Sequence, residues 1–106
     1  FEDVNEALPR VDRLLSQLAA AGKFDGVKGV LVGNFTRIPG TNMDDAQAQG
    51  LLYPLVLEHF RSRGTPVLGA WPSGHGDPNL TLPLGARVTL DTRRGALRLD
   101  QPITIA

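Results

Sequence analysis

The sequence predicts a single α/β (or α+β) domain with a mixed sheet, two helical regions and a C-terminal β-hairpin. Three observations support this class. Residues 8–21 have helical periodicity, residues 27–35 and 66–70 are short apolar runs typical of strands, and residues 86–99 alternate apolar and polar side chains. A chain of 106 residues with 42% hydrophobic residues is also the size of one ordinary domain.

The first helix is predicted over residues 8–21, where apolar residues recur at i, i+3, i+4 and i+7. These are Val11, Leu14, Leu15 and Leu18. Polar residues take the opposite face, and Gly22 follows the last periodic position, where helices commonly end. The helix should therefore bury one face against the core.

A strand covered on both sides is predicted over residues 27–35, because this run is nearly continuously apolar and flanked by glycines. Residues 37–42 read as a loop. Residues 43–62 have a helical composition, but Gly50 and Pro54 interrupt them, so we expect a kinked helix or two short ones.

The second strand, residues 66–70, leads directly into the loop WPSGHGDPN, residues 71–79. After it, residues 86–91 and 95–99 are predicted to pair around the turn at residues 92–95. His75 should therefore lie just past the C-terminal end of a strand.

Composition excludes several function classes. Eleven basic and eleven acidic residues cancel, which argues against a nucleic-acid partner. With no cysteine there can be no disulfide or thiolate nucleophile, and the apolar run at residues 51–57 is too short to span a membrane. His59 has no partner at metal-ligand spacing, so we expect no metal site.

His75 lies between two glycines and is bracketed by prolines, a rigid mount on which a general base could be approached closely. The alternative is an ordinary turn that contains a solvated histidine. Ser73 and Asp77 are local candidates for nucleophile and orienting acid. However, i−2, i, i+2 spacing in a tight loop controls geometry poorly, and the chain has no G-x-S-x-G motif.

Acidic residues cluster near the N-terminus. Glu6 is expected to place favourable charge near the start of the first helix. Glu2 is expected on the final turn of a strand, where a carboxylate can be held rigidly. The chain starts at Phe1 without a methionine, so we expect a piece of a longer protein.

Several motifs in this order resemble the C-terminal domain of the LD-carboxypeptidases, which include muramoyltetrapeptide carboxypeptidases and microcin C self-immunity peptidases. They are FEDVNE (residues 1–6), RVDRLLSQL (10–18), GNFT (33–36), PSGHG (72–76) and NLTLPLG (79–85). The resemblance implies that residues 1–106 form a swivelling-type β/β/α domain of a two-domain enzyme. It also implies a Ser-Glu-His triad whose glutamate is Glu2 and whose histidine is His75.

The same resemblance places the serine on an N-terminal domain outside this chain, so the 106 residues alone should be inactive. It implies a cytoplasmic serine carboxypeptidase, often a homodimer. Such an enzyme needs no cofactor and removes the terminal D-alanine from murein tetrapeptides during peptidoglycan recycling. Two alternatives stay open: a binding or dimerisation module of the same fold without chemistry, and a peptidase that acts on a peptidyl-nucleotide antibiotic.

Overall fold

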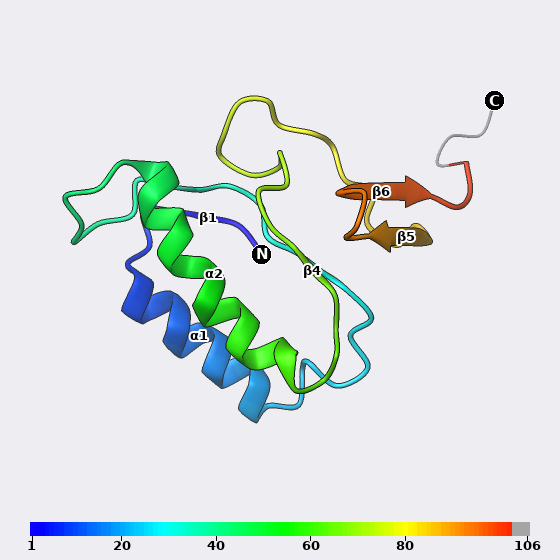
Figure 1. The fold of residues 1–106 in the computed structure, drawn as a ribbon, viewed down its shortest axis with the longest axis horizontal. Coiled ribbons are helices and arrows are strands. Elements are labelled where there is room, and N and C mark those ends of the chain that lie inside the picture. The colour runs from blue at the N-terminus through cyan, green and yellow to red at the C-terminus, as the bar shows by residue number, and fades with distance from the viewer. Residues whose placement is uncertain (103–106) are drawn as a thin grey trace.

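The computed structural model describes residues 1–102 and has two helices and six short strands, an α+β fold (Figure 1). The elements in chain order are β1 (Asp3–Val4), α1 (Leu8–Ala20), β2 (Val30–Leu31), β3 (Phe35–Thr36), α2 (Asp45–Arg61), β4 (Val67–Leu68), β5 (Val88–Asp91) and β6 (Ala96–Leu99). The predicted fold class is therefore confirmed. None of the helices in this part of the chain is long and apolar enough to cross a membrane.

The strands form three two-stranded sheets. β1 pairs with β3 and β2 pairs with β4, both in parallel, while β5 and β6 pair in antiparallel as the predicted hairpin. A further parallel bridge joins Asn34 to Gly74. The segment that contains β2 and β3 thus lies between the N-terminal segment and the segment that leads to His75.

The single strand predicted over residues 27–35 begins later, at Val30, and is divided into β2 and β3. Val27 instead closes a turn by donating its backbone N–H to the Phe24 carbonyl, so extended pairing begins only at Val30. Between β2 and β3, Val32 donates to Leu68 and Gly33 donates to Phe1. The backbone between β2 and β3 is therefore still hydrogen-bonded to the N-terminal segment on one side and to β4 on the other.

Helix α1 forms where the apolar periodicity predicts it. Pro9 lies in its first turn, where a missing N–H costs no helical hydrogen bond. Val11 and Leu15 are buried, and Gly22 follows the helix at φ +68°, a conformation that favours glycine. The helix therefore ends where the sequence indicates.

Helix α2 is one element rather than two short ones. Pro54 removes the hydrogen bond that would reach the Gly50 carbonyl, but both residues are exposed, so water can satisfy that carbonyl. On the opposite side Ala48, Leu52 and Val56 are buried at helical spacing. Burial of this face holds the helix together across the proline.

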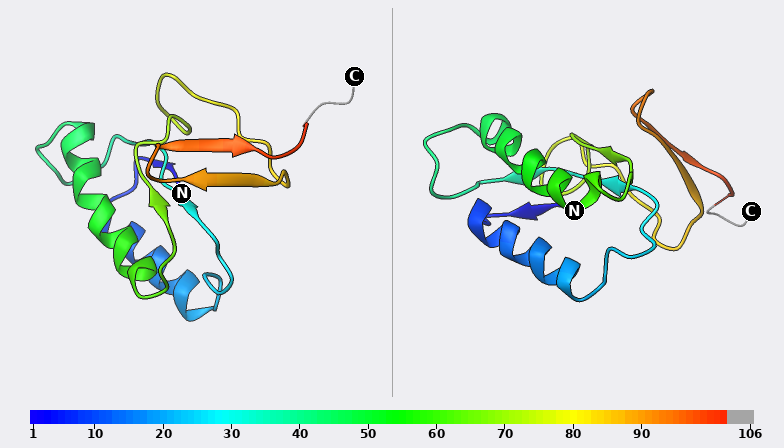
Figure 2. Two further views of the ribbon diagram at one scale, coloured as in Figure 1. Left: turned by 45° about the vertical axis from the view of Figure 1, so that its right-hand side comes forward. Right: turned by 60° about the horizontal axis from the view of Figure 1, so that its bottom comes forward.

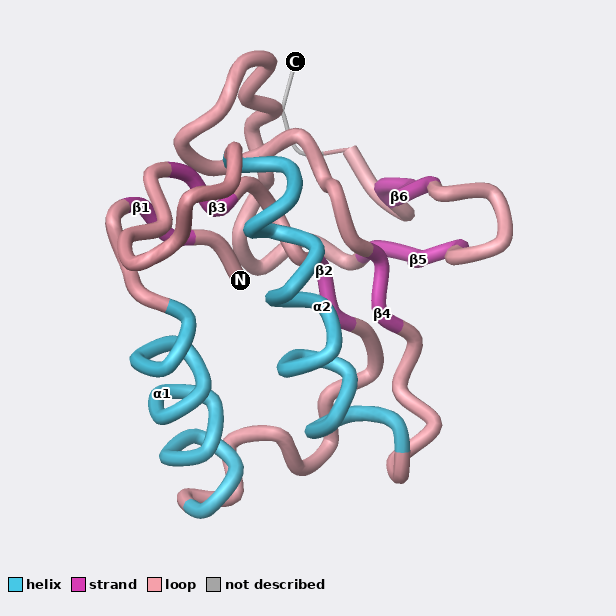
Figure 3. Tube along the Cα trace, turned by 60° about the vertical axis from the view of Figure 1, so that its left-hand side comes forward, coloured by secondary structure: helices cyan, strands magenta, loops and turns pink. Residues whose placement is uncertain are grey.

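The core lies between the helices and the parallel strands (Figures 2 and 3). At one end the Phe24 and Phe60 rings pack with centroids 4.6 Å apart. The hairpin lies away from the helices, and its Leu90 packs against Gly29, the residue before β2. The buried residues are Val11, Leu15, Phe24, Val30, Val32, Phe35, Ile38, Ala48, Leu52, Val56 and Phe60.

The start of α2 is fixed by a capping box. The Gln47 backbone N–H donates to Asp44 Oδ1 at 2.8 Å, and the Asp44 N–H donates to Gln47 Oε1 at 3.2 Å. Asp44→Ala should lower the free energy of unfolding by about 1 kcal/mol, measured by urea denaturation. Glu58→Ala on the exposed side of the same helix should change it by less than about 0.5 kcal/mol. Equal losses of unfolding free energy in the two variants would show that the capping box does not stabilise the helix.

Candidate active site

Glu2 is held in place by backbone hydrogen bonds of Phe1, the residue before it. The Phe1 nitrogen donates to the Leu31 carbonyl at 2.7 Å, and the Gly33 N–H donates to the Phe1 carbonyl at 2.7 Å. Burial lowers the pKa of the Phe1 amino group, and the neighbouring Glu2 carboxylate opposes that shift. Glu2 lies immediately before β1, whereas the sequence predicts it at the end of a strand, so that predicted position is wrong.

The loop that carries His75 is hydrogen-bonded to residues 30–36, the stretch from β2 to β3 that we call the central segment. Trp71 donates its N–H to the Val32 carbonyl at 3.0 Å, and the Ser73 carbonyl accepts from the Asn34 N–H at 2.9 Å. Within the loop, the Gly74 N–H donates to Asn79 Oδ1 at 3.1 Å. His75 therefore follows a stretch of chain whose backbone is fixed by its neighbours.

These two supports bring Glu2 and His75 together, although 73 positions separate them in sequence. His75 Nδ1 lies 2.8 Å from Glu2 Oε2, and the side chains are 50% and 43% exposed. A carboxylate can only accept, so this hydrogen bond requires the proton on Nδ1. In the neutral ring Nε2 is then an acceptor, and no side chain of the described residues hydrogen-bonds to it.

Two glycines leave room for this contact. A Cβ on Gly74 would lie 2.8 Å from Glu2 Oε2, and Gly74 has φ +120°. A Cβ on Gly33 would clash with the Ser73 carbonyl oxygen and lie 3.2 Å from Glu2 Cβ. The Glu2 side chain thus reaches His75 across backbone that carries no side chain. The close approach expected beside His75 is present at Gly74.

The local alternatives do not assemble around the ring. The Nδ1 atom pairs with Glu2 instead of Asp77, and Ser73 contributes backbone groups to the strand ladder. Among residues 1–102 no group of three or more histidine, cysteine, aspartate or glutamate side chains could hold a metal ion. His59 lies on α2 with its ring centroid 5.8 Å from that of Phe24.

Glu6 likewise stays outside the site. Its carboxylate pairs with Arg10 Nε at 3.0 Å, one turn further along the chain. Its expected role as charge near the start of α1 stays a prediction, because Glu6 lies before the helix and no acidic residue lies in the first turn.

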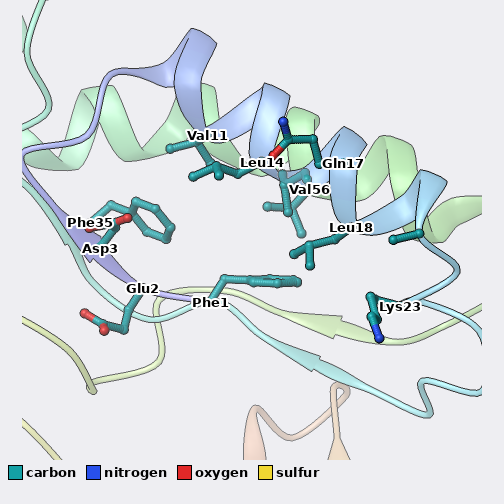
Figure 4. A pocket seen from close by; sticks show the side chains of 12 residues that line it. Phe1, Glu2, Asp3, Val11, Leu14, Gln17, Leu18, Lys23, Phe35 and Val56 are labelled. Atoms are coloured by element: carbon teal, nitrogen blue, oxygen red, sulfur yellow. The ribbon is translucent and has the colours of Figure 1, made fainter.

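An apolar cavity of about 460 Å³ lies on the helix side of the N-terminal segment, and Phe1, Leu14 and Leu18 line it together with Glu2. Figure 4 shows the Glu2 carboxylate pointing away from Leu14 and Leu18. Glu2 therefore borders the cavity, but its carboxylate is directed away from the apolar lining, and His75 does not line the cavity.

Two residues near the site were not identified from the sequence. Gln49 and Tyr53 lie one turn apart on α2, and their side chains hydrogen-bond to each other. The Gln49 side chain also bonds the backbone of Phe35 in β3, and the Tyr53 hydroxyl bonds the backbone of Ala70, directly before the His75 loop. Their i, i+4 spacing was the available signal. Polar residues at that spacing are common on exposed helix faces, so the signal alone was weak.

Comparison with known families identifies the family of this chain. The family model described as LD-carboxypeptidase C-terminal domain matches residues 1–90. The chain belongs to the LD-carboxypeptidase family. This match spans both Glu2 and His75, the two residues that the fold brings together.

Curated relatives include proteins with carboxypeptidase names and a self-immunity protein. A Streptomyces coelicolor protein named "Putative carboxypeptidase SCO6489" is 37% identical over 102 residues, which is 96% of this chain and 30% of the relative. The Bacillus subtilis "Probable murein peptide carboxypeptidase" is 29% identical over 92 residues, 87% of this chain and 28% of the relative. The Escherichia coli "Microcin C7 self-immunity protein MccF" is 29% identical over 91 residues, 86% of this chain and 25% of the relative.

This LD-carboxypeptidase domain thus spans less than one third of the length of these relatives. No solved structure gives a significant match to it. The family membership supports a peptidase, and the relatives' names support a carboxypeptidase.

Proposed function

We propose that this domain supplies the glutamate and histidine of a Ser-Glu-His triad in a serine LD-carboxypeptidase that removes the terminal D-alanine from murein tetrapeptides. The 2.8 Å contact between Glu2 Oε2 and His75 Nδ1 carries this proposal. Family membership and a murein peptide carboxypeptidase among the relatives support it. The serine and the oxyanion donors would come from an N-terminal domain of the same protein.

In this mechanism His75 moves the protons and Glu2 orients the ring. Nε2 takes the proton of the serine hydroxyl as the serine oxygen attacks the carbonyl carbon before the terminal D-alanine. The imidazolium, stabilised by the ionised Glu2, then protonates the nitrogen of the departing D-alanine as the C–N bond breaks. Water hydrolyses the acyl-enzyme by the same route, with Nε2 again the base, and the serine is restored.

The half-exposed His75 ring supports a site that is shared with a second domain. With Nδ1 occupied by Glu2, the free Nε2 edge of His75 is the edge that a serine on another domain would have to meet. We further propose a cytoplasmic homodimer that needs no cofactor, with a role in peptidoglycan recycling. These last features rest on the family resemblance alone.

The proposal predicts that residues 1–106 alone release no D-alanine, because they lack the nucleophile. Activity should appear in a chimera in which residues 1–106 replace the matching segment of the Streptomyces coelicolor relative. D-alanine release from a murein tetrapeptide measures both. Release by the isolated chain that disappears in Ser73→Ala would mean that the loop is a complete site and that the proposed division is wrong.

A second substrate class is favoured by the similarity to the microcin C7 self-immunity protein, which has the same 29% identity to this chain as the murein peptide carboxypeptidase. That substrate would be a peptidyl-nucleotide antibiotic. Incubating the longer protein that carries this domain with both substrates separates the two. Turnover of neither substrate, with the fold intact, would favour a binding module of the same fold.

A further inference from the structure

We infer that Gln49 and Tyr53 are positioning residues that hold the His75 loop against the segment beside Glu2. The inference rests on the proposed role of His75. Both residues lie on helix α2, and neither side chain hydrogen-bonds to the His75 ring or to the Glu2 carboxylate.

Tyr53 fixes the chain where it leaves β4. The Ala70 N–H donates to Tyr53 Oη at 3.1 Å, five residues before His75. Ala70 has φ +52°, an unusual conformation for a residue with a side chain, so its backbone depends on support from outside. A Cβ on Gly69 would lie 2.8 Å from Tyr53 Cε1, which shows how closely the ring packs against this backbone.

Gln49 fixes the central segment beside Glu2. Its Oε1 accepts from the Phe35 N–H at 3.1 Å, and its Nε2 approaches the Gly33 carbonyl at 3.4 Å. These two contacts hold the backbone on both sides of Asn34. Asn34 in turn donates to Ser73, and its side chain packs against Gly76, so it contacts the chain on both sides of His75.

The two side chains act as one unit because Gln49 Nε2 donates to Tyr53 Oη at 3.0 Å. The hydroxyl therefore accepts hydrogen bonds from Ala70, directly before the His75 loop, and from the side chain that holds the central segment. Removing this single oxygen would break both. The expected consequence is a looser Glu2–His75 contact in a domain that still folds.

The ring tautomer of His75 reports this contact without any need for activity. Long-range ¹H–¹⁵N NMR spectra of the 106-residue chain distinguish Nδ1–H from Nε2–H in a neutral imidazole, and His59 is the only other histidine. The unsubstituted chain should show Nδ1–H at His75. In Tyr53→Phe the ratio of Nδ1–H to Nε2–H should fall about three- to tenfold, the change that corresponds to one neutral hydrogen bond.

Two further variants make the test decisive. Gln49→Met should shift the same ratio in the same direction while keeping the Tyr53 hydroxyl. Asp44→Ala, which weakens the cap of the same helix, should lower the melting temperature and leave the ratio unchanged. An unchanged ratio in both site variants, or an equal shift in Asp44→Ala, would overturn the positioning role. Nε2–H in the unsubstituted chain would instead refute the Glu2–His75 pair itself and the inference with it.

Discussion

Glu2→Gln is expected to lower kcat for D-alanine release by the chimera about 10⁴-fold, with little change in melting temperature. The amide nitrogen of glutamine can donate to Nδ1, which a carboxylate cannot do. Such a donor favours the tautomer with the proton on Nε2, so the ring can no longer accept the proton of the serine. The substituted side chain has nearly the same shape, and both partners are about half exposed, so the fold should tolerate it.

Asp3→Asn is the matched control for this charge removal. Asp3 is the adjacent carboxylate, and its Oδ1 accepts a local hydrogen bond from the Val4 N–H at 2.7 Å. Its loss should change kcat only a few-fold, because Asp3 has no hydrogen bond to either residue of the pair. A Glu2→Gln enzyme within tenfold of the unsubstituted rate would exclude Glu2 as the orienting acid.

Gly74→Ala is expected to lower kcat/KM by about 100-fold or more, because the new methyl group would occupy the path of the Glu2 side chain. Its Cβ would lie 2.8 Å from Glu2 Oε2 and 3.1 Å from the Asn34 carbonyl oxygen. The carboxylate would have to move, and the 2.8 Å contact with His75 would lengthen. The measurement is steady-state kinetics of the chimera together with its melting temperature.

Gly85→Ala separates this steric effect from backbone strain. Gly85 also has a positive φ, +83°, but a Cβ there would meet nothing within 4 Å. This variant should lose stability and keep its rate per folded molecule. If both variants lost the same activity, the loss at Gly74 would come from strain and not from displacement of Glu2.

Local patterns predicted much of the fold. The periodicity of residues 8–21 predicted α1, and the alternation on both sides of residues 92–95 predicted the β5–β6 hairpin, because each pattern reflects contacts made by the element itself. The continuity of α2 could not be predicted in this way. It depends on burial of Leu52 and Val56 by distant parts of the chain, which outweighs the local effect of Pro54.

Only part of the candidate site could be predicted from the sequence. The loop composition marked His75 as a possible base, but pairing with Glu2 followed only from the family resemblance, because no local rule connects residues 73 positions apart. Gln49 and Tyr53 were missed for a related reason. Their hydrogen bonds go to backbone groups of Phe35 and Ala70, and such groups carry no signal in a sequence.

The most direct test of the proposed role of this domain is D-alanine release by the chimera with and without His75→Ala. The unsubstituted chimera should release D-alanine from a murein tetrapeptide. The His75→Ala chimera, folded to the same extent by circular dichroism, should be slower by about 10⁴-fold or more, because no other group in the loop hydrogen-bonds to Glu2. Equal rates for the two chimeras would contradict the assignment of His75 as the general base.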